Sequence, residues 1–341
     1  MKVTIDINQL FWISIGAGLT LFVETLGWLY WRYWGAGSIR DYVSEEEEPD
    51  GDYRIIRKIK SPIQQIALVE NQGQTLVYGK GDLMFGTIEA EEIYAEAFIH
   101  VPMAIARKRE RILIIGGGGG ITTREALRYP DVKEITTVDA DEMMMNLGKN
   151  NEALVKFNEG ALNHPKVRTV VEDGRAFVES TPEKWDAIFI DIPEPSEECP
   201  ALSRLFSWEF FELLKERLEP DGVINVSCPS LAKIPEYLWS VQATLMAVEF
   251  YVLPYHFDVI VEYEEDYGFC MATNSQVLAD NISIPIPTRF LSPERLQDMV
   301  YIPYNYALTI SKESLIFLTQ YHMVKKVRNR SFLLKNSGSF Y

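Results

Sequence analysis

The sequence predicts an α/β fold with a Rossmann-like doubly wound sheet, and three observations support this. Residues Ile112 to Gly120 read ILIIGGGGG, so that four aliphatic residues lead directly into five consecutive glycines. A continuous apolar run before a glycine turn is typical of a buried parallel strand. A helix-like stretch begins at Thr122, directly after the glycines. Helix and strand patterns then alternate as far as residue 273, which indicates a sheet with helices on both faces.

The other elements follow in a consistent order along the chain. Short apolar runs from Tyr53 to Gly86 alternate with turn residues, which predicts a small antiparallel sheet ahead of the main one. Residues 89–107 have a helical pattern and lead into the glycine strand. A later helix is expected to begin with Ser207 as its N-cap. The segments that alternate beyond the glycines are 135–138, 167–171, 185–191, 207–218, 222–228, 232–248, 250–255 and 267–273.

The amino-terminal segment predicts one transmembrane helix. Residues 10–30 are almost entirely apolar, and about 20 such residues span the hydrocarbon core of a bilayer. Tryptophans lie near both ends of this run, as in an interfacial aromatic belt: Trp12, Trp28, Trp31 and Trp34. Basic residues are more frequent after the run than before it, which predicts a single-pass anchor with the large domain in the cytoplasm. The alternative is an interfacial or oligomerising helix.

Composition restricts the class of partner. The net charge of −16 argues against a nucleic-acid-binding surface and suits a cationic small substrate, although acidity alone also keeps a protein soluble. Cys199, Cys228 and Cys270 are odd in number and contain no C-x-x-C pair, which indicates reduced, buried thiols. The four histidines show no metal-ligand spacing, so no metal is expected.

The glycine turn predicts a nucleoside-containing ligand. Glycines let the backbone approach a bound group closely, and the helix that follows presents unpaired N–H groups. Asp139 lies 23 residues after Gly116 at the end of a second apolar run, where doubly wound folds place an acid for a ribose diol. A dinucleotide motif would need glycine at Ile121 or Thr122, and no P-loop motif is present. The pattern therefore favours an S-adenosyl donor, which has no pyrophosphate.

Acidic residues follow several of the predicted strands. Because ligands of such sheets lie beyond the carboxyl ends of the strands, these acids are candidates for ligand contact. Asp139 is expected to bind the ribose hydroxyls, and Asp173, directly before Gly174, the adenine amino group. Asp191 ends a strand and is expected to point into the reaction crevice, with Glu194 close behind it. The alternative for each acid is a helix cap or an Asx turn, but a series of them at successive strand ends favours a functional site.

Six short motifs are spread along the chain from about residue 61 to about residue 307. They are SPIQQ at 61–65, EEIYAEAFIHVP at 91–102, IIGGGGGITTRE at 114–125, IDIPEP at 190–195, LFSWEFF at 205–211 and LPYH at 253–256. The first three are similar to the S-x-Y-Q, D-E-x-x-Y-H-E and I-G-G-G-D-G motifs of one family, the spermidine synthases or polyamine aminopropyltransferases. The last three look like the longer, membrane-anchored bacterial branch of that family.

The resemblance implies an SN2 transfer of a 3-aminopropyl group from decarboxylated S-adenosylmethionine to an amine such as putrescine. Asp191 matches the catalytic aspartate, which would orient the amine and accept its proton. Tyr94, Glu194 and Tyr255 would contact the amine, although packing in the core is the alternative for the two tyrosines. The residues that would bind the donor are Gln64, Gly116, Gly117, Gly118, Gly119, Asp139, Asp173 and Gly174.

The chain departs from the family pattern at the amine end. Ile63, Ala95 and Glu194 replace a tyrosine, a histidine or glutamine, and an aspartate of the family, and Gly119 replaces the aspartate of its glycine loop. That aspartate would repel the carboxylate of intact S-adenosylmethionine by about 4 kcal/mol at about 4 Å and an effective dielectric constant near 20. Plant putrescine N-methyltransferases also lack it. The alternatives are therefore an S-adenosylmethionine-dependent N-methyltransferase acting on an amine, or a non-catalytic, membrane-anchored nucleoside-binding protein.

The expected organisation follows from these patterns. The resemblance also implies a homodimer that pairs through the small amino-terminal sheet. The expected regions are a membrane anchor at 1–40, an acidic linker at 41–52, a small β-strand domain plus helix at 53–106, a Rossmann-like nucleoside-binding catalytic domain at 107–320 and a basic tail at 321–341.

Overall fold

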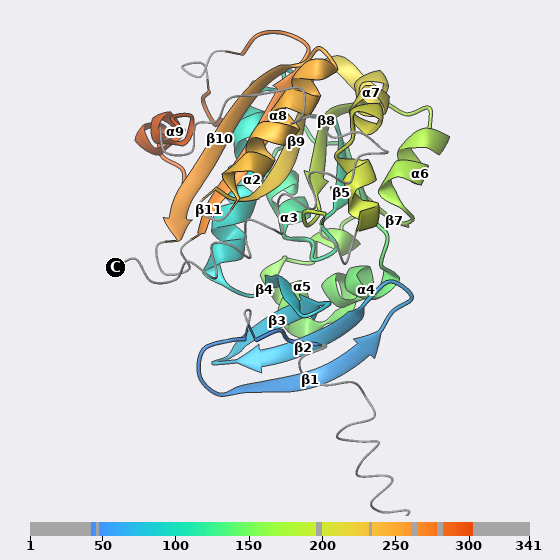
Figure 1. Ribbon diagram of the computed structural model, residues 1–341, viewed down its shortest axis with the longest axis vertical. Coiled ribbons are helices and arrows are strands. Elements are labelled where there is room, and N and C mark those ends of the chain that lie inside the picture. Colours follow the sequence, from blue (N-terminus) through green and yellow to red (C-terminus); the bar gives the residue numbers. More distant parts are fainter. Residues whose placement is uncertain are drawn as a thin grey trace, which may run out of the picture. The chain divides into compact units, whose positions relative to one another are not determined.

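The computed structural model describes residues 42–45, 48–195, 200–231, 234–260, 265–277 and 282–302 (Figure 1). The chain divides into two compact units. Of the described residues, the smaller unit contains those up to Lys60 together with Gln64–Gln72 and Leu76–Met84, and the larger contains Ser61–Ile63, Gly73–Thr75 and those from Phe85 onward. The anchor expected at 1–40, the tail expected at 321–341 and Cys199 lie outside the described residues. No helix within the described ranges is long and apolar enough to cross a bilayer.

The first sheet has four strands in the order β1-β2-β3-β4. They are β1 (Tyr53–Lys60), β2 (Gln65–Asn71), β3 (Gln74–Gly79) and β4 (Asp82–Gly86). Strands β1 and β2 pair in antiparallel register, and the turn between β2 and β3 contains Gly73 with a φ of 82°. The small antiparallel sheet predicted from this stretch is therefore confirmed.

The main sheet has seven strands in the order β10-β11-β9-β8-β5-β6-β7. Strands β5 (Arg111–Gly116), β6 (Glu134–Asp139), β7 (Val167–Val171), β8 (Trp185–Asp191) and β9 (Leu218–Ser230) are parallel to their neighbours within this group. Strands β10 (Tyr251–Ile260) and β11 (Glu265–Thr273) add an antiparallel hairpin beside β9. The predicted Rossmann-like fold is confirmed, and the sheet is mixed rather than wholly parallel.

Helices connect and cover these strands (Figure 1). Helix α7 (Trp208–Arg217) begins after Ser207, whose side chain accepts a hydrogen bond from the Phe210 N–H, so the N-cap predicted from the sequence is confirmed. The other described helices are α2 (Glu89–Ile105), α3 (Ile121–Leu127), α4 (Glu142–Asn150), α5 (Glu152–Phe157), α6 (Gly174–Ser180), α8 (Pro235–Ala247) and α9 (Pro293–Met299), with short 3-10 turns η2 (Ala161–Asn163) and η3 (Pro200–Leu205).

Strand β5 is buried on both of its faces. Leu113 and Ile115 pack into one apolar cluster, with residues of α6, α7 and α8. Ile112 and Ile114 pack into a second cluster, with residues of α2, α3 and α9. Because successive side chains of a strand point to opposite faces, a strand covered on both sides is apolar at every position. This explains the uninterrupted apolar run before the glycines.

The order of the parallel strands defines where the site lies. The chain runs from β5 outward to β6 and β7, and then returns to the other side of β5 as β8. The last residues of β5 and β8, Gly116 and Asp191, are partners in the parallel register. Ligands of open α/β sheets bind at such a reversal, beyond the carboxyl ends of the strands. The glycine turn and Asp191 are therefore neighbours at the expected edge.

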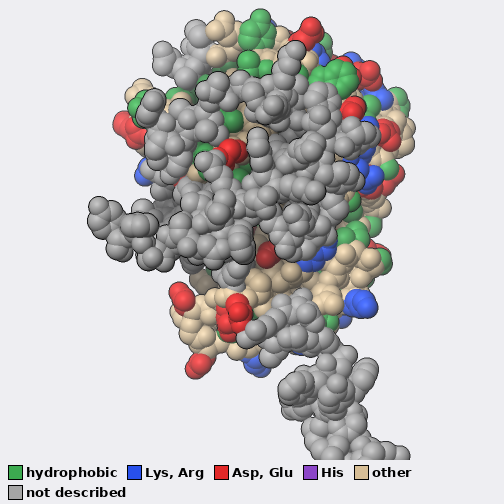
Figure 2. All heavy atoms as spheres, in the orientation of Figure 1, with side chains coloured by type: hydrophobic (Ala, Val, Ile, Leu, Met, Phe, Trp, Pro, Cys, Tyr) green, Lys and Arg blue, Asp and Glu red, His purple; other side chains and the backbone are tan. Residues whose placement is uncertain are grey.

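The described surface visible in Figure 2 carries charges of both signs, with Lys and Arg side chains interspersed among Asp and Glu side chains. Ion pairs on the described surface include Arg54 with Glu70 at 2.5 Å and Arg168 with Glu183 at 3.1 Å. Cys228 and Cys270 are buried and free, as expected for thiols in the core.

Candidate active site

The glycine turn after β5 is shaped by a close approach of two strands. Gly116 and Gly117 have φ values of 90° and 68°, in the left-handed region that glycine tolerates. A Cβ added to Gly116 would lie 1.9 Å from the carbonyl oxygen of Asp191. The Gly117 N–H also donates to that carbonyl at 3.2 Å. Only glycine at position 116 permits the ends of β5 and β8 to approach this closely.

Asp139, at the end of β6, is tied to the same turn. Its Oδ2 accepts a hydrogen bond from the Gly118 N–H at 3.1 Å, and its Oδ1 accepts one from the Asp141 N–H at 2.8 Å. Burial raises the pKa of Asp139 to about 6; these two N–H donors oppose the shift, while the negative charges of Asp141 and Asp191 add to it. The structure therefore places the predicted ribose acid against the glycine turn, where a bound nucleoside would meet it.

Asp191 ends β8 and is held by two hydroxyl groups. The Tyr94 hydroxyl donates to Oδ1 at 2.8 Å, and the Thr122 hydroxyl donates to Oδ2 at 2.9 Å. Burial raises the pKa of Asp191, and these two hydrogen bonds lower it in part. A buried carboxylate held by neutral donors is a stronger base than one in water and has a defined orientation. This is the arrangement that proton acceptance from a substrate requires.

Tyr94 comes from α2 and is itself fixed by aromatic packing. Its ring stacks on Phe98 at a centroid distance of 5.4 Å and meets the Tyr267 ring edge-on at 5.2 Å. Burial raises the pKa of the Tyr94 hydroxyl well above its ordinary value, with the charge of Asp191 adding to the effect. The hydroxyl is therefore neutral and remains a hydrogen-bond donor to Asp191. The structure brings this predicted residue to the predicted catalytic acid.

Glu91 was not identified from the sequence as a site residue. Its pKa is raised to about 8, mainly by burial and also by the charge of Asp191, while a hydrogen bond from the Gly86 N–H opposes the shift. The residue lies three positions before Tyr94 in α2, so both side chains lie on the same side of the helix. The three-residue spacing between Glu91 and Tyr94 is the feature of the sequence that could have identified Glu91 as a site residue. Thr122 was likewise missed, although it directly follows the glycines and lies at the start of α3.

Asp173 has two protein partners at the start of α6. Its Oδ1 accepts a hydrogen bond from the Ala176 N–H at 3.0 Å, which makes it the N-cap of the helix. Its Oδ2 pairs with the guanidinium of Arg204. The helix cap considered for this acid is therefore present, and the adenine contact stays a prediction. Gly174 packs tightly behind it, because a Cβ there would lie 2.4 Å from Cγ2 of Ile115.

Glu194 and Tyr255, the other two residues expected to contact the amine, differ in their burial. Glu194 follows β8 and is half-buried, and its charge contributes to raising the pKa values of the buried Cys228 thiol and the Tyr237 hydroxyl. Tyr255 is fully buried, donates to the Ala97 carbonyl at 3.1 Å and accepts from the Asn225 amide at 2.8 Å. The expectation that Tyr255 lines an amine channel is therefore corrected, because its hydroxyl joins α2 to the sheet inside the core.

The SPIQQ motif is divided between the two units. The Ser61 hydroxyl donates to Oδ2 of the buried Asp141 at 2.7 Å, and the Asp141 N–H in turn donates to Asp139. This links the first residue of the motif to the predicted ribose acid. Gln64 belongs to the smaller unit, where its side-chain amide lies against Gly79. Its expected role in donor binding stays a prediction.

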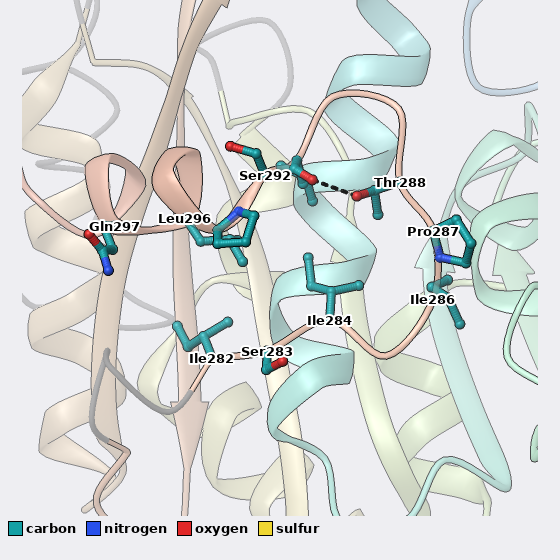
Figure 3. A pocket seen from close by; sticks show the side chains of 11 residues that line it. Ile282, Ser283, Ile284, Ile286, Pro287, Thr288, Ser292, Leu296 and Gln297 are labelled. Carbon is teal, nitrogen blue, oxygen red and sulfur yellow. Dashed lines mark hydrogen bonds between the residues drawn. The ribbon is translucent and has the colours of Figure 1, made fainter.

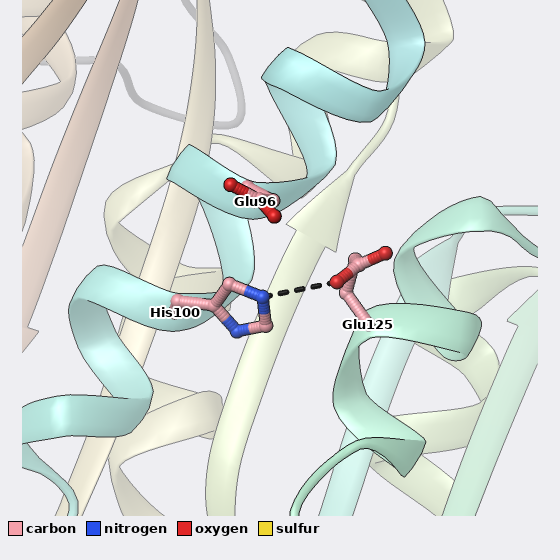
Figure 4. A group of neighbouring side chains, drawn as sticks. All are labelled: Glu96, His100 and Glu125. Atoms are coloured by element: carbon pink, nitrogen blue, oxygen red, sulfur yellow. Dashed lines mark hydrogen bonds and ion pairs between the residues drawn. The ribbon is translucent and has the colours of Figure 1, made fainter. Parts of the chain in front are cut away.

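One cluster in the described residues has the geometry of metal ligands. Glu96, His100 and Glu125 offer ligand atoms within 4.8 Å of one another (Figure 4). The guanidinium of Arg128 already lies among these groups, 2.6 Å from Glu125 and 3.4 Å from Glu96. Burial alone would raise the pKa of Glu125, but hydrogen bonds from His100 and Arg128 outweigh it and lower the pKa to about 2. The cluster is an ion-pair network that joins α2 to α3.

A cavity of about 420 Å³ lies in the segment from Ile282 to Gln297 (Figure 3). Its lining is partly apolar, with Ile284 and Leu296, and partly polar, with Thr288 and Ser292. None of the residues expected to bind a donor or an amine lines it. It is therefore separate from the site formed by the glycine turn and Asp191.

Comparison with known proteins is consistent with this geometry. The family model for the spermine/spermidine synthase domain matches residues 91–281. A polyamine aminopropyltransferase of Oceanobacillus iheyensis is 34% identical over 242 residues, covering 71% of this chain and 46% of that protein. Polyamine aminopropyltransferase 2 of Bacillus cereus is 34% identical over 251 residues, covering 72% of this chain and 67% of that protein. This chain thus spans about half the length of the first of these relatives.

Solved structures show the same fold. Spermidine synthase from Thermotoga maritima has a TM-score of 0.64 and 20% sequence identity, covering 77% of this chain and 87% of that one. A spermidine synthase in complex with the transition state analogue AdoDATO has a TM-score of 0.66 and 21% identity, covering 77% and 88%. The sequence motifs, the family match over more than half of the chain and the shared fold show that this chain belongs to the spermine/spermidine synthase family.

Proposed function

We propose that this protein is a polyamine aminopropyltransferase that transfers a 3-aminopropyl group from decarboxylated S-adenosylmethionine to an amine such as putrescine. The observation that carries the proposal is the Asp191 carboxylate, which Tyr94 and Thr122 hold beside the glycine turn. Membership of the family and the names of the relatives support it. The overall negative charge of the chain also suits a cationic substrate.

In this proposal the donor lies across the glycine turn. The backbone of Gly116, Gly117 and Gly118 approaches the nucleoside, and Asp139 accepts hydrogen bonds from the ribose hydroxyls. Asp173 and Gly174, at the start of α6, serve the adenine end. Because the Gly118 N–H already fixes Oδ2 of Asp139, the ribose acid and the glycine turn hold a constant spacing. Such preorganisation reduces the entropy lost when the donor binds.

The reaction has a simple electron and proton balance. The lone pair of the acceptor amine attacks the methylene carbon next to the sulfonium, and a C–N bond forms. The C–S bond breaks, its electron pair returns to sulfur, and neutral 5′-methylthioadenosine leaves. The amine nitrogen gives up one proton, which Asp191 accepts. Positioned general bases of this kind contribute about 10²–10⁴ to the rate. Glu194 supplies a second negative charge for the cationic acceptor.

A second candidate is an N-methyltransferase that uses intact S-adenosylmethionine. The specific observation in its favour is Gly119, where the family has an aspartate that would repel the carboxylate of the intact donor. The nucleoside contacts and the base would be the same. The two reactions differ in the carbon that is attacked and in the product, which is S-adenosylhomocysteine after methyl transfer.

Mass spectrometry of the products distinguishes these candidates. The purified protein is incubated with each donor and a panel of amines that includes putrescine. Aminopropylated amine together with 5′-methylthioadenosine supports the leading proposal. Methylated amine together with S-adenosylhomocysteine supports the second candidate. If calorimetry shows that no adenosyl compound binds, both proposals are wrong.

We further propose that residues 1–40 anchor the protein to a membrane, with the larger domain on the cytoplasmic side. The apolar run at 10–30, its tryptophans and the basic residues after it support this proposal. Cell fractionation of the full-length chain and of a variant without residues 1–40 tests it. The full-length chain is expected in the membrane fraction and the shortened one in the supernatant. A full-length chain that stays in the supernatant would contradict the anchor.

A homodimer that forms through the small sheet is proposed as well. Ile56 of β1 is 47% exposed, so this strand of the small sheet offers an apolar side chain to a partner. Sedimentation of the wild-type chain and of Ile56→Glu tests this. A dimer that the substitution dissociates is expected, and a monomeric wild-type chain would rule out the proposal.

A further inference from the structure

The ring of Phe85 fills the space where residue 119 lacks a side chain. A Cβ added to Gly119 would lie 2.9 Å, 3.0 Å and 3.2 Å from Cδ2, Cγ and Cε2 of Phe85. Real Cβ atoms essentially never come within 3.0 Å of another heavy atom, so a side chain at 119 and this position of the ring exclude each other. The loss of the family's carboxylate is therefore coupled to the presence of an aromatic ring at the same place.

The position of Phe85 is fixed by its neighbours. The side chain is only 9% exposed. The N–H of the next residue, Gly86, donates to the Glu91 carboxylate. The Thr87 N–H donates to the Thr75 carbonyl at 2.8 Å, and the Thr87 hydroxyl accepts from the Thr75 N–H at 2.8 Å. These contacts fix the backbone after Phe85, and the burial of the side chain keeps its ring beside Gly119.

Consecutive glycines of the turn face three different groups. The Cβ position of Gly117 lies 3.2 Å from Oδ2 of Asp191, and that of Gly118 lies 2.6 Å from Oδ2 of Asp139. The Cβ position of Gly119 lies against Phe85. A donor with its ribose at Asp139 and its reacting carbon at Asp191 would lie along this turn. In aminopropyl transfer the reacting carbon is the first methylene of the aminoalkyl tail, and in methyl transfer the tail is the third substituent of the sulfonium. In both cases the tail would extend from the sulfonium beside the turn, where the Phe85 ring faces Gly119.

We propose that Phe85 and Gly119 form the wall of the donor pocket that faces the aminoalkyl tail, and that this wall makes the site accept both decarboxylated and intact S-adenosylmethionine. This inference rests on the proposed function. An aromatic face attracts a sulfonium or ammonium group through its quadrupole. It carries no negative charge that would repel the carboxylate of the intact donor. Phe85 is thus a specificity-determining residue for the tail of the donor.

A four-variant cycle tests the proposal: wild type, Phe85→Ala, Gly119→Asp and the double variant. Calorimetry gives the Kd of decarboxylated S-adenosylmethionine, of intact S-adenosylmethionine and of 5′-methylthioadenosine for each protein. For the wild type, the Kd values of the two sulfonium donors are expected to agree within about tenfold. The double variant has both a carboxylate and the room for it, so its preference for the decarboxylated donor is expected to rise at least about tenfold. Gly119→Asp alone is expected to shift this preference less, because the Phe85 ring competes with the new side chain for the same space and hinders the carboxylate from reaching the tail.

The single variant Phe85→Ala provides a second readout that does not depend on a new carboxylate. It is expected to weaken both sulfonium donors several-fold more than the uncharged 5′-methylthioadenosine. Equal weakening of all three compounds, or none, would overturn the inference. A wild-type preference of more than about a hundredfold for the decarboxylated donor would overturn it as well. Thermal unfolding of each variant confirms that it folds.

Binding of 5′-methylthioadenosine, which has no charged tail, distinguishes a failure of this inference from a failure of the proposed function. If 5′-methylthioadenosine and both donors bind the wild type but the double variant keeps the wild-type preference, the inference is wrong and the proposed function stands. If none of the three compounds binds the wild type, the proposed function itself is wrong.

Discussion

The Tyr94 hydroxyl donates a hydrogen bond of 2.8 Å to Oδ1 of Asp191, across a separation of 97 residues in the sequence. The contact joins helix α2, which precedes the Rossmann-like sheet, to the strand that reverses its order. It fixes the orientation of the proposed base and adds a donor that favours its charged form. The predictions below test the groups around this contact and the network that holds α2 in place.

Replacement of the proposed base should remove turnover while leaving donor binding intact. Asp191→Asn keeps the shape of the side chain and loses the proton acceptor, so kcat is expected to fall by about 10²–10⁴. Steady-state rates and donor calorimetry measure the two effects. Asp131→Asn is the matched control, because Asp131 is 43% exposed and forms an ion pair with Arg109. A variant at 191 with the wild-type rate would remove Asp191 from the mechanism.

Loss of the Tyr94 hydroxyl should lower turnover, because the carboxylate of Asp191 loses a group that orients it, and should raise the pKa of Asp191. Tyr94→Phe keeps the stacking on Phe98 and deletes the donor to Asp191. Hydrogen bonds to charged groups contribute about 1.5–3 kcal/mol, so a loss of about tenfold or more in kcat is expected. The donor stabilises the carboxylate, and without it the pKa of Asp191 rises further. The acidic limb of the pH–rate profile should therefore move to higher pH, and an unmoved limb would contradict this assignment.

Thr122→Val gives an independent check of the same geometry. It removes the hydroxyl that donates to Oδ2 at 2.9 Å and retains a β-branched side chain of similar volume at the start of α3. The same direction of pH shift is expected as for Tyr94→Phe. The double variant should show a larger shift than either single variant, because each donor stabilises a different carboxylate oxygen.

Glu91 should make the protein less stable as the pH rises. Its pKa is raised from 4.5 to about 8 in the folded chain, so the folded state binds the proton more tightly than the unfolded state. The free energy of unfolding is therefore expected to fall as the pH rises from about 4.5 to about 8. Glu91→Gln keeps an oxygen that accepts from the Gly86 N–H and does not ionise.

Urea unfolding at pH 6 and pH 9 measures this effect of Glu91. Each pKa unit corresponds to about 1.4 kcal/mol, so the variant should gain at least about 1 kcal/mol relative to the wild type between the two pH values. Glu110→Gln is the control, because Glu110 is 46% exposed in a surface pair with Lys133. An equal pH dependence in the wild type and Glu91→Gln would show that Glu91 is not the group responsible.

The network between α2 and α3 should contribute strongly to stability. Glu125 is 4% exposed and interacts with His100, Arg124 and Arg128. Breaking a buried ion pair on one side costs about 3–5 kcal/mol, so Glu125→Gln is expected to lower the free energy of unfolding by about that amount. The control is Glu70→Gln, whose partner Arg54 is 75% exposed, and it should change stability by less than about 1 kcal/mol.

The pH dependence of this contribution has the opposite sign to that of Glu91. The pKa of Glu125 is lowered from 4.5 to about 2 in the folded chain. Its stabilisation is therefore fully present above pH 4.5 and lost as the pH falls towards about 2. Thermal unfolding of the wild type and Glu125→Gln should converge at acidic pH. Curves that stay equally separated down to pH 2 would contradict this account.

Local patterns in the sequence were sufficient for the strands, the glycine turn and the acids at the strand ends. A strand buried on both faces must be apolar throughout, and the turn after β5 must be glycine where β8 approaches at Gly116. Asp139 and Asp191 follow such runs directly. These features depend on residues close together in the chain, so the sequence could predict them without knowledge of the remaining packing.

Tertiary structure alone decided which side chains meet. In the folded chain the Thr122 hydroxyl donates to Asp191, and Glu91 lies beside the same carboxylate. The ring of Phe85 packs against Gly119. Tertiary structure also buried Tyr255 in the core, where the sequence had suggested a channel. The physical reason is that helical or strand periodicity defines the face on which a side chain lies, whereas contacts between faces depend on how distant elements pack. Backbone patterns therefore determined the fold and its binding edge, and packing determined the chemistry at that edge.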